Sequence, residues 1–255
     1  MTDLTYDPDP ETLKAEHSKE AIEARVSADK QHSYVRDAVL GAIDGSVTTF
    51  AMVCGVMGGQ LDGSVAVLLG FAKLFADGFS MAVSNFEGTK SESEIIERAH
   101  DIERRHIEEI PDAEVAEVRE IYRQKGFDEE TIDRIVEVVT EDEELWIETM
   151  ITEEWQLPLE SPNAYWAGGV TFAAFCVAGL VPLVPFVWPG LGPDATFAVS
   201  AAATGATFVA IGLVKGKFTD VSMLRSGLTT LLTGGGAAAT AYLVGYLLRG
   251  LVGGV

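Results

Sequence analysis

Residues 195–214 read ATFAVSAAATGATFVAIGLV, twenty consecutive residues without a charged side chain. A helix needs about 20 residues to cross the roughly 30 Å hydrocarbon core of a bilayer. Two further uncharged segments of that length occur at 164–187 and 227–248. Their many Gly and Ala residues favour close helix packing in lipid. The sequence therefore predicts an all-α membrane protein.

Two more segments are long and apolar enough to be spans, although they contain charged residues. Segment 38–57 includes Asp44, and segment 65–86 includes Lys73 and Asp77. The fold class is accordingly predicted as five transmembrane helices. Prolines are expected to bend or end the third span, at Pro182, Pro185 and Pro189.

Acidic residues are concentrated in one part of the chain. The 255 residues carry a formal net charge of −21, yet the mean hydropathy is +0.19. Residues 91–160 hold 24 acidic and seven basic side chains, whereas residues 161–255 hold two and four. This balance offers no basic footprint for phosphates, which excludes a nucleic-acid partner. We predict an acidic aqueous insert at 91–160, between spans two and three.

Basic residues near the span ends predict the topology, because Lys and Arg are retained on the cytoplasmic side. Lys30 and Arg36 precede the first span, and Lys215, Lys217 and Arg225 precede the fifth. The N-terminus and the insert are therefore expected in the cytoplasm. Four domains are predicted: the N-terminal tail at 1–35, the first two spans at 36–90, the insert at 91–160 and the last three spans at 161–255.

The tail is polar and acidic, and we expect it to be mobile and to lead into a short helix. It matches neither a signal peptide nor an Arg-rich transit peptide. An acidic surface with few lysines is also typical of a protein that lives in concentrated salt. These features favour a prokaryotic cell membrane as the location.

The insert has the pattern of four charged helices. One narrow apolar stripe is predicted on the first helix, at Ile95, Ile96, Ala99, Ile102, His106 and Ile110. Asp112 is expected to cap the second helix and Gly126 to end it, while the third helix opens near Asp128 and the fourth near Asp142. About 65 residues form little independent core, so we expect these helices to need each other, a second copy of the chain or a bound metal.

Charged side chains within a span are functional candidates, because their burial in lipid is costly. Asp44 lies on one helix face with Thr48 and Met52, and four-residue steps also align the set Lys73, Asp77, Met81 and Asn85. Carboxylate and thioether ligands together suit a borderline ion such as Fe²⁺, whereas carboxylates alone suit Mg²⁺ or Ca²⁺. The alternatives are that Asp44 caps a kink at Gly45 and that Lys73 and Asp77 merely neutralise each other.

Three close pairs in the insert have the spacing of metal ligands on one helix face. They are Glu103 with His106, Glu114 with Glu117, and Met150 with Glu154. Glu-rich helices also produce such spacings by chance, and most of the acidic residues are expected to serve only as a hydrated surface.

Several longer motifs resemble the vacuolar iron transporter family. In the spans these are DGSVTTF at 44–50, ADGFSMA at 76–82 and VKGKFT at 214–219, and in the insert they are PDAEVAEV at 111–118 and WIETM at 146–150. The similarity runs from about Val35 to Leu248. It implies five spans, a homodimer, a cytoplasmic metal-binding insert, and export of Fe²⁺ from the cytosol in exchange for protons.

The resemblance also implies roles for individual residues. Asp44 and Met81 match the family's pore carboxylate and pore methionine, and five insert residues match its metal ligands: Glu103, Glu114, Glu117, Met150 and Glu154. Three positions depart from the family pattern. His106 and Lys73 stand where a glutamate is expected, and Ile151 stands where a second methionine is expected. Asp77, one turn from Lys73, is a possible substitute for the missing pore carboxylate.

These observations predict a transporter rather than an enzyme, without a permanently bound cofactor. The insert would concentrate Fe²⁺ for a pathway that is lined by Asp44 and Met81, and Asp77 would carry the proton. Export of Mn²⁺ by the same fold is one alternative. The other is a membrane-tethered, ferritin-like di-iron oxidase, because Glu103-x-x-His106 is half of the motif that such bundles use.

Overall fold

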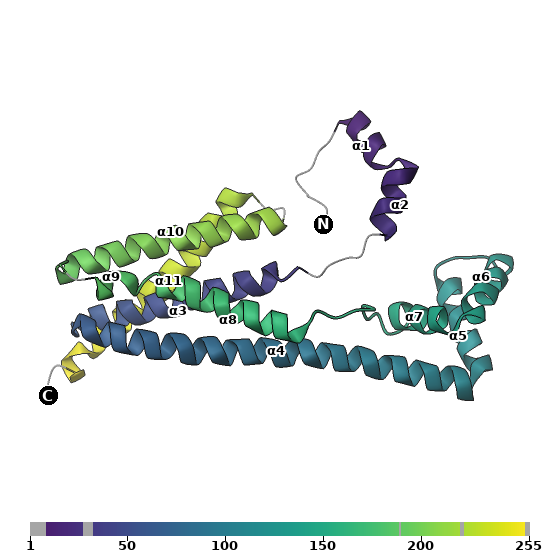
Figure 1. The fold of residues 1–255 in the computed structure, drawn as a ribbon, viewed down its shortest axis with the longest axis horizontal. Helices are drawn as coiled ribbons and strands as arrows, with labels where there is room; N and C mark the ends of the chain where they lie inside the picture. Colours follow the sequence, from purple (N-terminus) through teal and green to yellow (C-terminus); the bar gives the residue numbers. More distant parts are fainter. Residues whose placement is uncertain (1–8, 28–32, 189, 220–221, 253–255) are drawn as a thin grey trace. The chain divides into compact units, whose positions relative to one another are not determined.

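The computed structural model describes residues 9–27, 33–188, 190–219 and 222–252, and within them every regular element is an α-helix (Figure 1). The predicted all-α class is confirmed. The helices are α1 (Pro10–Glu16), α2 (Lys19–Ser27), α3 (Val35–Gly58), α4 (Gly63–Glu109), α5 (Pro111–Gln124), α6 (Glu129–Glu141), α7 (Glu143–Glu153), α8 (Ala164–Leu180), α9 (Val184–Val187), α10 (Pro193–Thr219) and α11 (Met223–Val252).

The chain divides into two compact units. The membrane unit comprises Met1–Asn85 and Tyr165–Val255, and the second unit comprises Phe86–Ala164, which encloses the predicted insert. Helix α4 belongs to both, because its 47 residues continue from the second predicted span into the insert without a break (Figure 1). The chain has neither proline nor a turn signal between the apolar and the charged parts of this helix, so nothing in the sequence ends it.

Four helices in the described part of the chain are long and apolar enough to cross a membrane, namely α3, α4, α10 and α11. The third predicted span is broken near Pro182, where the prolines were expected to bend or end it, and its helix is shorter than the predicted segment 164–187. Helix α8 has 17 residues and ends at Leu180, and the short helix α9 follows a turn that contains Pro182. Proline removes a backbone donor and clashes with the preceding turn, which explains the break. The structure therefore supports four of the five expected spans by length and composition.

Helix α3 packs on its neighbours through glycine. A Cβ atom at Gly41 or Gly45 would collide with the backbone of α8, at the carbonyl oxygens of Thr171 and Phe175. Further along α3, a Cβ at Gly58 would collide with the carbonyl oxygen of Tyr242 in α11. These contacts bring helix backbones together as closely as small residues allow, which is how membrane helices commonly associate.

The insert is held together by two small apolar clusters. The first joins α5, α6 and α7 through Val118, Ile132, Val136, Val139, Trp146 and Met150. The second joins α4 to α7 through Ala99, Ile147 and Ile151. Ile107 of α4 packs against both clusters.

The predicted stripe on the first insert helix was partly wrong. Ile95 and Ile110 are exposed, and the buried face of α4 instead runs through Ile96, Ala99, Glu103 and Ile107. Like the predicted stripe, these positions follow steps of three and four residues, but they lie on the side of α4 that packs against α7. A carboxylate, Glu103, thus occupies a position on the buried face.

Aspartates cap two insert helices as expected. Asp128 accepts a hydrogen bond from the backbone N–H of Thr131 at 3.0 Å, and Asp142 accepts one from Glu144 at 3.0 Å. The second insert helix differs, because Ile110 is its cap residue and Pro111 opens it, so Asp112 lies in its first turn. Gly126 follows the end of that helix with a φ of +91°, a left-handed conformation that commonly ends helices. The prediction that Gly126 ends the second insert helix is therefore confirmed.

The N-terminal tail contains more helix than predicted, because α1 and α2 occupy most of residues 10–27. Asp9 caps α1 with hydrogen bonds to the backbone N–H groups of Glu11 and Thr12. The remaining stretches predicted to be mobile, residues 1–8 and 28–32, lie outside the described residues.

Candidate metal site

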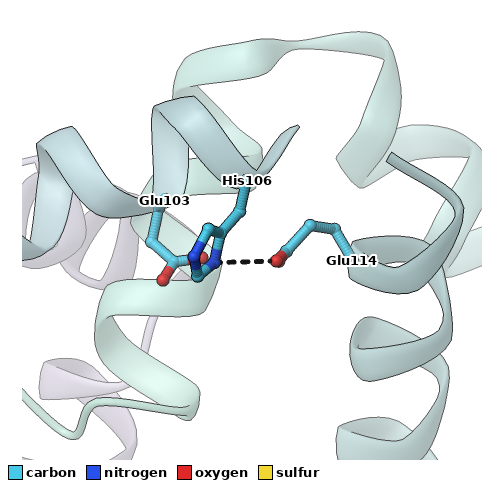
Figure 2. A group of neighbouring side chains, drawn as sticks. All are labelled: Glu103, His106 and Glu114. Atoms are coloured by element: carbon cyan, nitrogen blue, oxygen red, sulfur yellow. Dashed lines mark ion pairs between the residues drawn. The ribbon is translucent and has the colours of Figure 1, made fainter. Parts of the chain in front are cut away.

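Three side chains of the insert converge on one point. Glu103, His106 and Glu114 each offer one ligand atom, and these atoms all lie within 4.8 Å of one another (Figure 2). The Nδ1 atom of His106 lies 3.1 Å from Oε1 of Glu114, an ion-pair distance. Two carboxylates and an imidazole are ligands that suit Fe²⁺, Mn²⁺ and Zn²⁺ alike.

The local fold explains how the three residues meet. Glu103 and His106 are one turn apart on α4, so they project from neighbouring positions of the helix. The helix ends at Glu109, and Pro111 restarts the chain as α5, which presents Glu114 in its first turn. Figure 2 shows the Glu114 side chain reaching from α5 toward the two ligands on α4.

The two carboxylates are buried and incompletely paired. Glu103 and Glu114 are each only 1% exposed. Oε1 of Glu103 accepts a hydrogen bond from the indole Nε1–H of Trp155 at 2.7 Å. Its Oε2 and both oxygens of Glu114 are buried and accept no hydrogen bond among the described residues, and the only neighbour of Glu114 at ion-pair distance there is His106, through Oε1. Burying such groups costs free energy unless a hydrogen bond or a cation compensates, so this site is suited to hold a positive ion.

The electrostatics of the site favour the same conclusion. Burial above all, and then the negative charges of Glu103 and Glu117, raise the pKa of Glu114 to about 7, while His106 acts in the opposite direction. Burial and the charges of the same two glutamates also raise the pKa of Glu154. Carboxylates crowd together here without a permanent cation, and a divalent ion would relieve their repulsion.

The other insert residues that were predicted as ligands lie around this cluster. Glu117 and Glu154 are exposed, but both are close enough for their charges to act on Glu114. Met150 is fully buried and packs in the apolar cluster with Val118 and Trp146. The structure thus brings Glu103, His106 and Glu114 into one site, with Glu117 and Glu154 within electrostatic range and Met150 in the adjoining core.

The charged residues of the spans form a second group. Lys73 and Asp77 of α4 make an ion pair, and both charges act on Asp44 of α3. One open groove is lined by Thr48 and Met52 of α3, by Lys73 and by residues of α11 such as Val244. Met81, one turn beyond Asp77, is half-buried.

Asn85 does not share this face, although four-residue spacing placed it there. Its amide donates hydrogen bonds to Asp37 of α3 at 2.9 Å and to Thr171 of α8 at 2.8 Å. Asp37 was not predicted to take part in any contact. Each four-residue step on a helix rotates about 40°, so Asn85 is turned about 120° away from Lys73.

Trp155 is the residue of the insert site that was missed. It contacts Glu103 across 52 positions of sequence, and no local periodicity signals such a pair. The only sequence hint is an aromatic side chain directly after the predicted ligand Glu154.

Comparison with known proteins identifies the family. The model of the VIT family matches residues 35–246. The vacuolar iron transporter of Toxoplasma gondii is 31% identical over 260 residues, covering 96% of this chain and 86% of that protein. Vacuolar iron transporter 1 of Tulipa gesneriana is 30% identical, covering 92% of each chain, and vacuolar iron transporter 1 of Arabidopsis thaliana is 27% identical, covering 98% of this chain and 97% of that protein. The chain therefore belongs to the VIT family.

Proposed function

We propose that this protein carries Fe²⁺ out of the cytosol across a membrane, in exchange for protons. The relatives that match over most of its length are named iron transporters. The observation that carries the proposal is the buried cluster of Glu103, His106 and Glu114, because three of its four carboxylate oxygens accept no hydrogen bond among the described residues and a cation would compensate their burial.

The insert captures the ion. Glu103, His106 and Glu114 form the inner ligands, and Glu117 and Glu154 add negative charge that attracts a divalent cation. Met150 serves as a further ligand only if its sulfur turns from the apolar cluster toward the carboxylates. Water completes the coordination, since three protein ligands leave positions open on an ion of this size.

The pathway through the membrane unit is lined by Asp44 and Met81. Carboxylate oxygen and thioether sulfur replace part of the water around Fe²⁺. Lys73 forms an ion pair with Asp77, whereas no ion pair joins Asp44 to a basic side chain among the described residues, so Asp44 is the stronger candidate ligand. A proton that neutralises one of these carboxylates promotes release of the metal.

The basic flanks support five crossings rather than four. With α3, α4, α10 and α11 alone, the insert and the segment that carries Lys215, Lys217 and Arg225 would lie on opposite sides of the membrane. A fifth crossing, made by α8 with α9, returns both to the cytoplasm as the distribution of Lys and Arg favours. Helix α8 alone would span only about 25 Å, so the turn and α9 complete the crossing.

A homodimer completes the pathway in this proposal. Two copies around a two-fold axis place two Asp44 carboxylates and two Met81 sulfurs on a shared path. The relatives named above are eukaryotic. A prokaryotic cell membrane stays a prediction that rests on the acidic surface.

Flux measurements on the full chain in liposomes test the function. Asp44→Ala is expected to abolish Fe²⁺ uptake and the accompanying change of internal pH, while the protein keeps its helical signal and oligomeric state. Asp194→Ala removes an exposed carboxylate from the same unit and should transport normally. Undiminished flux in Asp44→Ala would refute the pathway. Competition between Fe²⁺ and Mn²⁺ in the same assay decides which metal is preferred.

A further inference from the structure

The indole of Trp155 contacts the metal site from outside the ligand set. Its Nε1–H donates a hydrogen bond of 2.7 Å to Oε1 of Glu103. Trp155 is 39% exposed, whereas Glu103 is 1% exposed. A ring at the surface thus reaches a carboxylate in the interior, and no other hydrogen bond to that carboxylate occurs among the described residues.

Backbone hydrogen bonds at the end of α7 determine where Trp155 lies. The backbone N–H of Trp155 bonds to the carbonyl of Met150 at 3.2 Å, and that of Leu157 bonds to Ile151 at 3.0 Å. Between them Gln156 has a φ of +54°, a conformation that residues other than glycine rarely adopt. The backbone on both sides of Gln156 is thus hydrogen-bonded to the last turn of α7, which places Trp155 directly after the helix.

The hydrogen bond makes the two carboxylate oxygens of Glu103 chemically different. Oε1 is occupied by the indole, and Oε2 is left buried and without a partner. A carboxylate without the indole would be free to turn, to bind through both oxygens or to take up a proton. Partners that orient a metal ligand in this way commonly contribute ten- to hundredfold to metal affinity.

We propose that Trp155 is a positioning residue for metal capture, which makes Glu103 a one-oxygen ligand beside His106 and Glu114. The inference rests on the proposed function. It adds a residue that acts on the metal only through Glu103.

Titration of the full-length protein in detergent with Mn²⁺, followed by calorimetry, tests the inference. Trp155→Phe keeps an aromatic ring and removes the donor, and it should weaken Mn²⁺ binding about tenfold. Trp146→Phe is the matched control, because Trp146 lies on α7, the helix that Trp155 follows, and its buried Nε1–H has no hydrogen-bond partner in the described structure. The control should bind Mn²⁺ as tightly as the wild-type protein.

A vibrational measurement separates positioning from a merely structural role. The indole N–H band of Trp155, assigned by its shift in Glu103→Gln, should move when Mn²⁺ draws charge from Glu103. This readout uses the wild-type protein, so it stands even if Trp155→Phe does not fold. An unmoved band, or equal Mn²⁺ affinity in Trp155→Phe and wild type, overturns the role of Trp155 alone. Failure of the wild-type protein to bind either Mn²⁺ or, under anaerobic conditions, Fe²⁺ overturns the proposed metal capture itself.

Discussion

Asp77 in the membrane unit and Glu114 in the insert are both carboxylates set among packed helices, but their surroundings differ. Asp77 is 40% exposed and forms an ion pair with the ammonium group of Lys73 on the same helix. Glu114 is 1% exposed and lies against His106, which is charged only when protonated. Asp77 thus has a basic partner on its own helix, whereas the cluster around Glu114 has an excess of negative charge that a cation can compensate.

The two units also differ in how they pack. In the membrane unit, glycines bring helix backbones into contact, as Gly45 does with Phe175. In the insert, branched and aromatic side chains such as Val118 and Trp146 fill the space between helices. Backbone contacts tolerate no added atoms, while side-chain clusters can adjust, so we expect the membrane unit to be the less forgiving of substitution.

Gly45→Ala should have the largest effect. The new Cβ would overlap the carbonyl oxygen and other backbone atoms of Phe175, which cannot move without shifting α8. We expect a loss of about 3 kcal/mol in the free energy of unfolding, or a failure to accumulate in the membrane. Thermal unfolding of the detergent-solubilised protein, followed by circular dichroism, measures the loss of stability.

Two other glycines serve as controls for Gly45. Gly169 lies in α8 of the same unit and Gly88 in the insert part of α4, and a Cβ at either position would meet nothing within 4 Å. Alanine there should leave stability unchanged or raise it by about 1 kcal/mol, because alanine is the better helix former. A Gly45→Ala protein as stable as these two would show that the backbone contact is not needed.

Much of this architecture could be predicted from the sequence. The apolar runs indicated the helices that span, and the aspartates at 128 and 142 indicated where two insert helices begin. The length of α8 could not be fixed, because three nearby prolines permit either a bend or an end. The continuity of α4 was missed because its composition changes from apolar to charged while its helical propensity does not.

The candidate site was predictable only where its residues are near in sequence. Glu103 and His106 are three residues apart, so helical spacing alone pairs them. Spacing paired Glu114 with Glu117 and resemblance made it a ligand, but its contact with His106 depends on the turn at Pro111. Trp155 joins Glu103 from the far end of the insert, and such a pairing is set by the packing of α7 on α4, which no short motif encodes.

Glu114→Gln tests the uncompensated charge directly. At pH 8 the substitution removes a buried negative charge at nearly constant volume, so we expect Mn²⁺ affinity to fall at least 30-fold, about 2 kcal/mol. The metal-free protein should become more stable at the same time, because the cost of burying that charge disappears. Calorimetric titration and thermal unfolding of one preparation measure both effects.

Glu108→Gln is the matched control for that pair of measurements. Glu108 lies on α4 close to His106 in sequence, but its side chain is exposed. Neutralising Glu108 should change neither the free energy of Mn²⁺ binding nor the free energy of unfolding by more than about 0.5 kcal/mol. A gain in stability as large as that of Glu114→Gln would attribute the effect to net charge rather than to burial.

The smallest effect is a pH dependence in which metal affinity and metal-free stability move in opposite directions. The pKa of Glu114 is raised to about 7 in the folded protein, chiefly by burial, from an ordinary value of 4.5. Between these values the folded state holds a proton that the unfolded state has lost. The stability of the metal-free insert should therefore fall as the pH rises through this window, by at most about 1.4 kcal/mol per pH unit.

Mn²⁺ affinity should rise over the same window, because the metal must displace that proton, and it should level off above pH 7. The expected slope is at most about tenfold per pH unit from this one group. Titrations at pH 5.5, 6.5, 7.5 and 8.5 measure it, and the difference between wild type and Glu114→Gln isolates Glu114, since His106 is present in both. If the two proteins show the same slope, the proton is held by another group and the insert's imbalance of charge does not reside at Glu114.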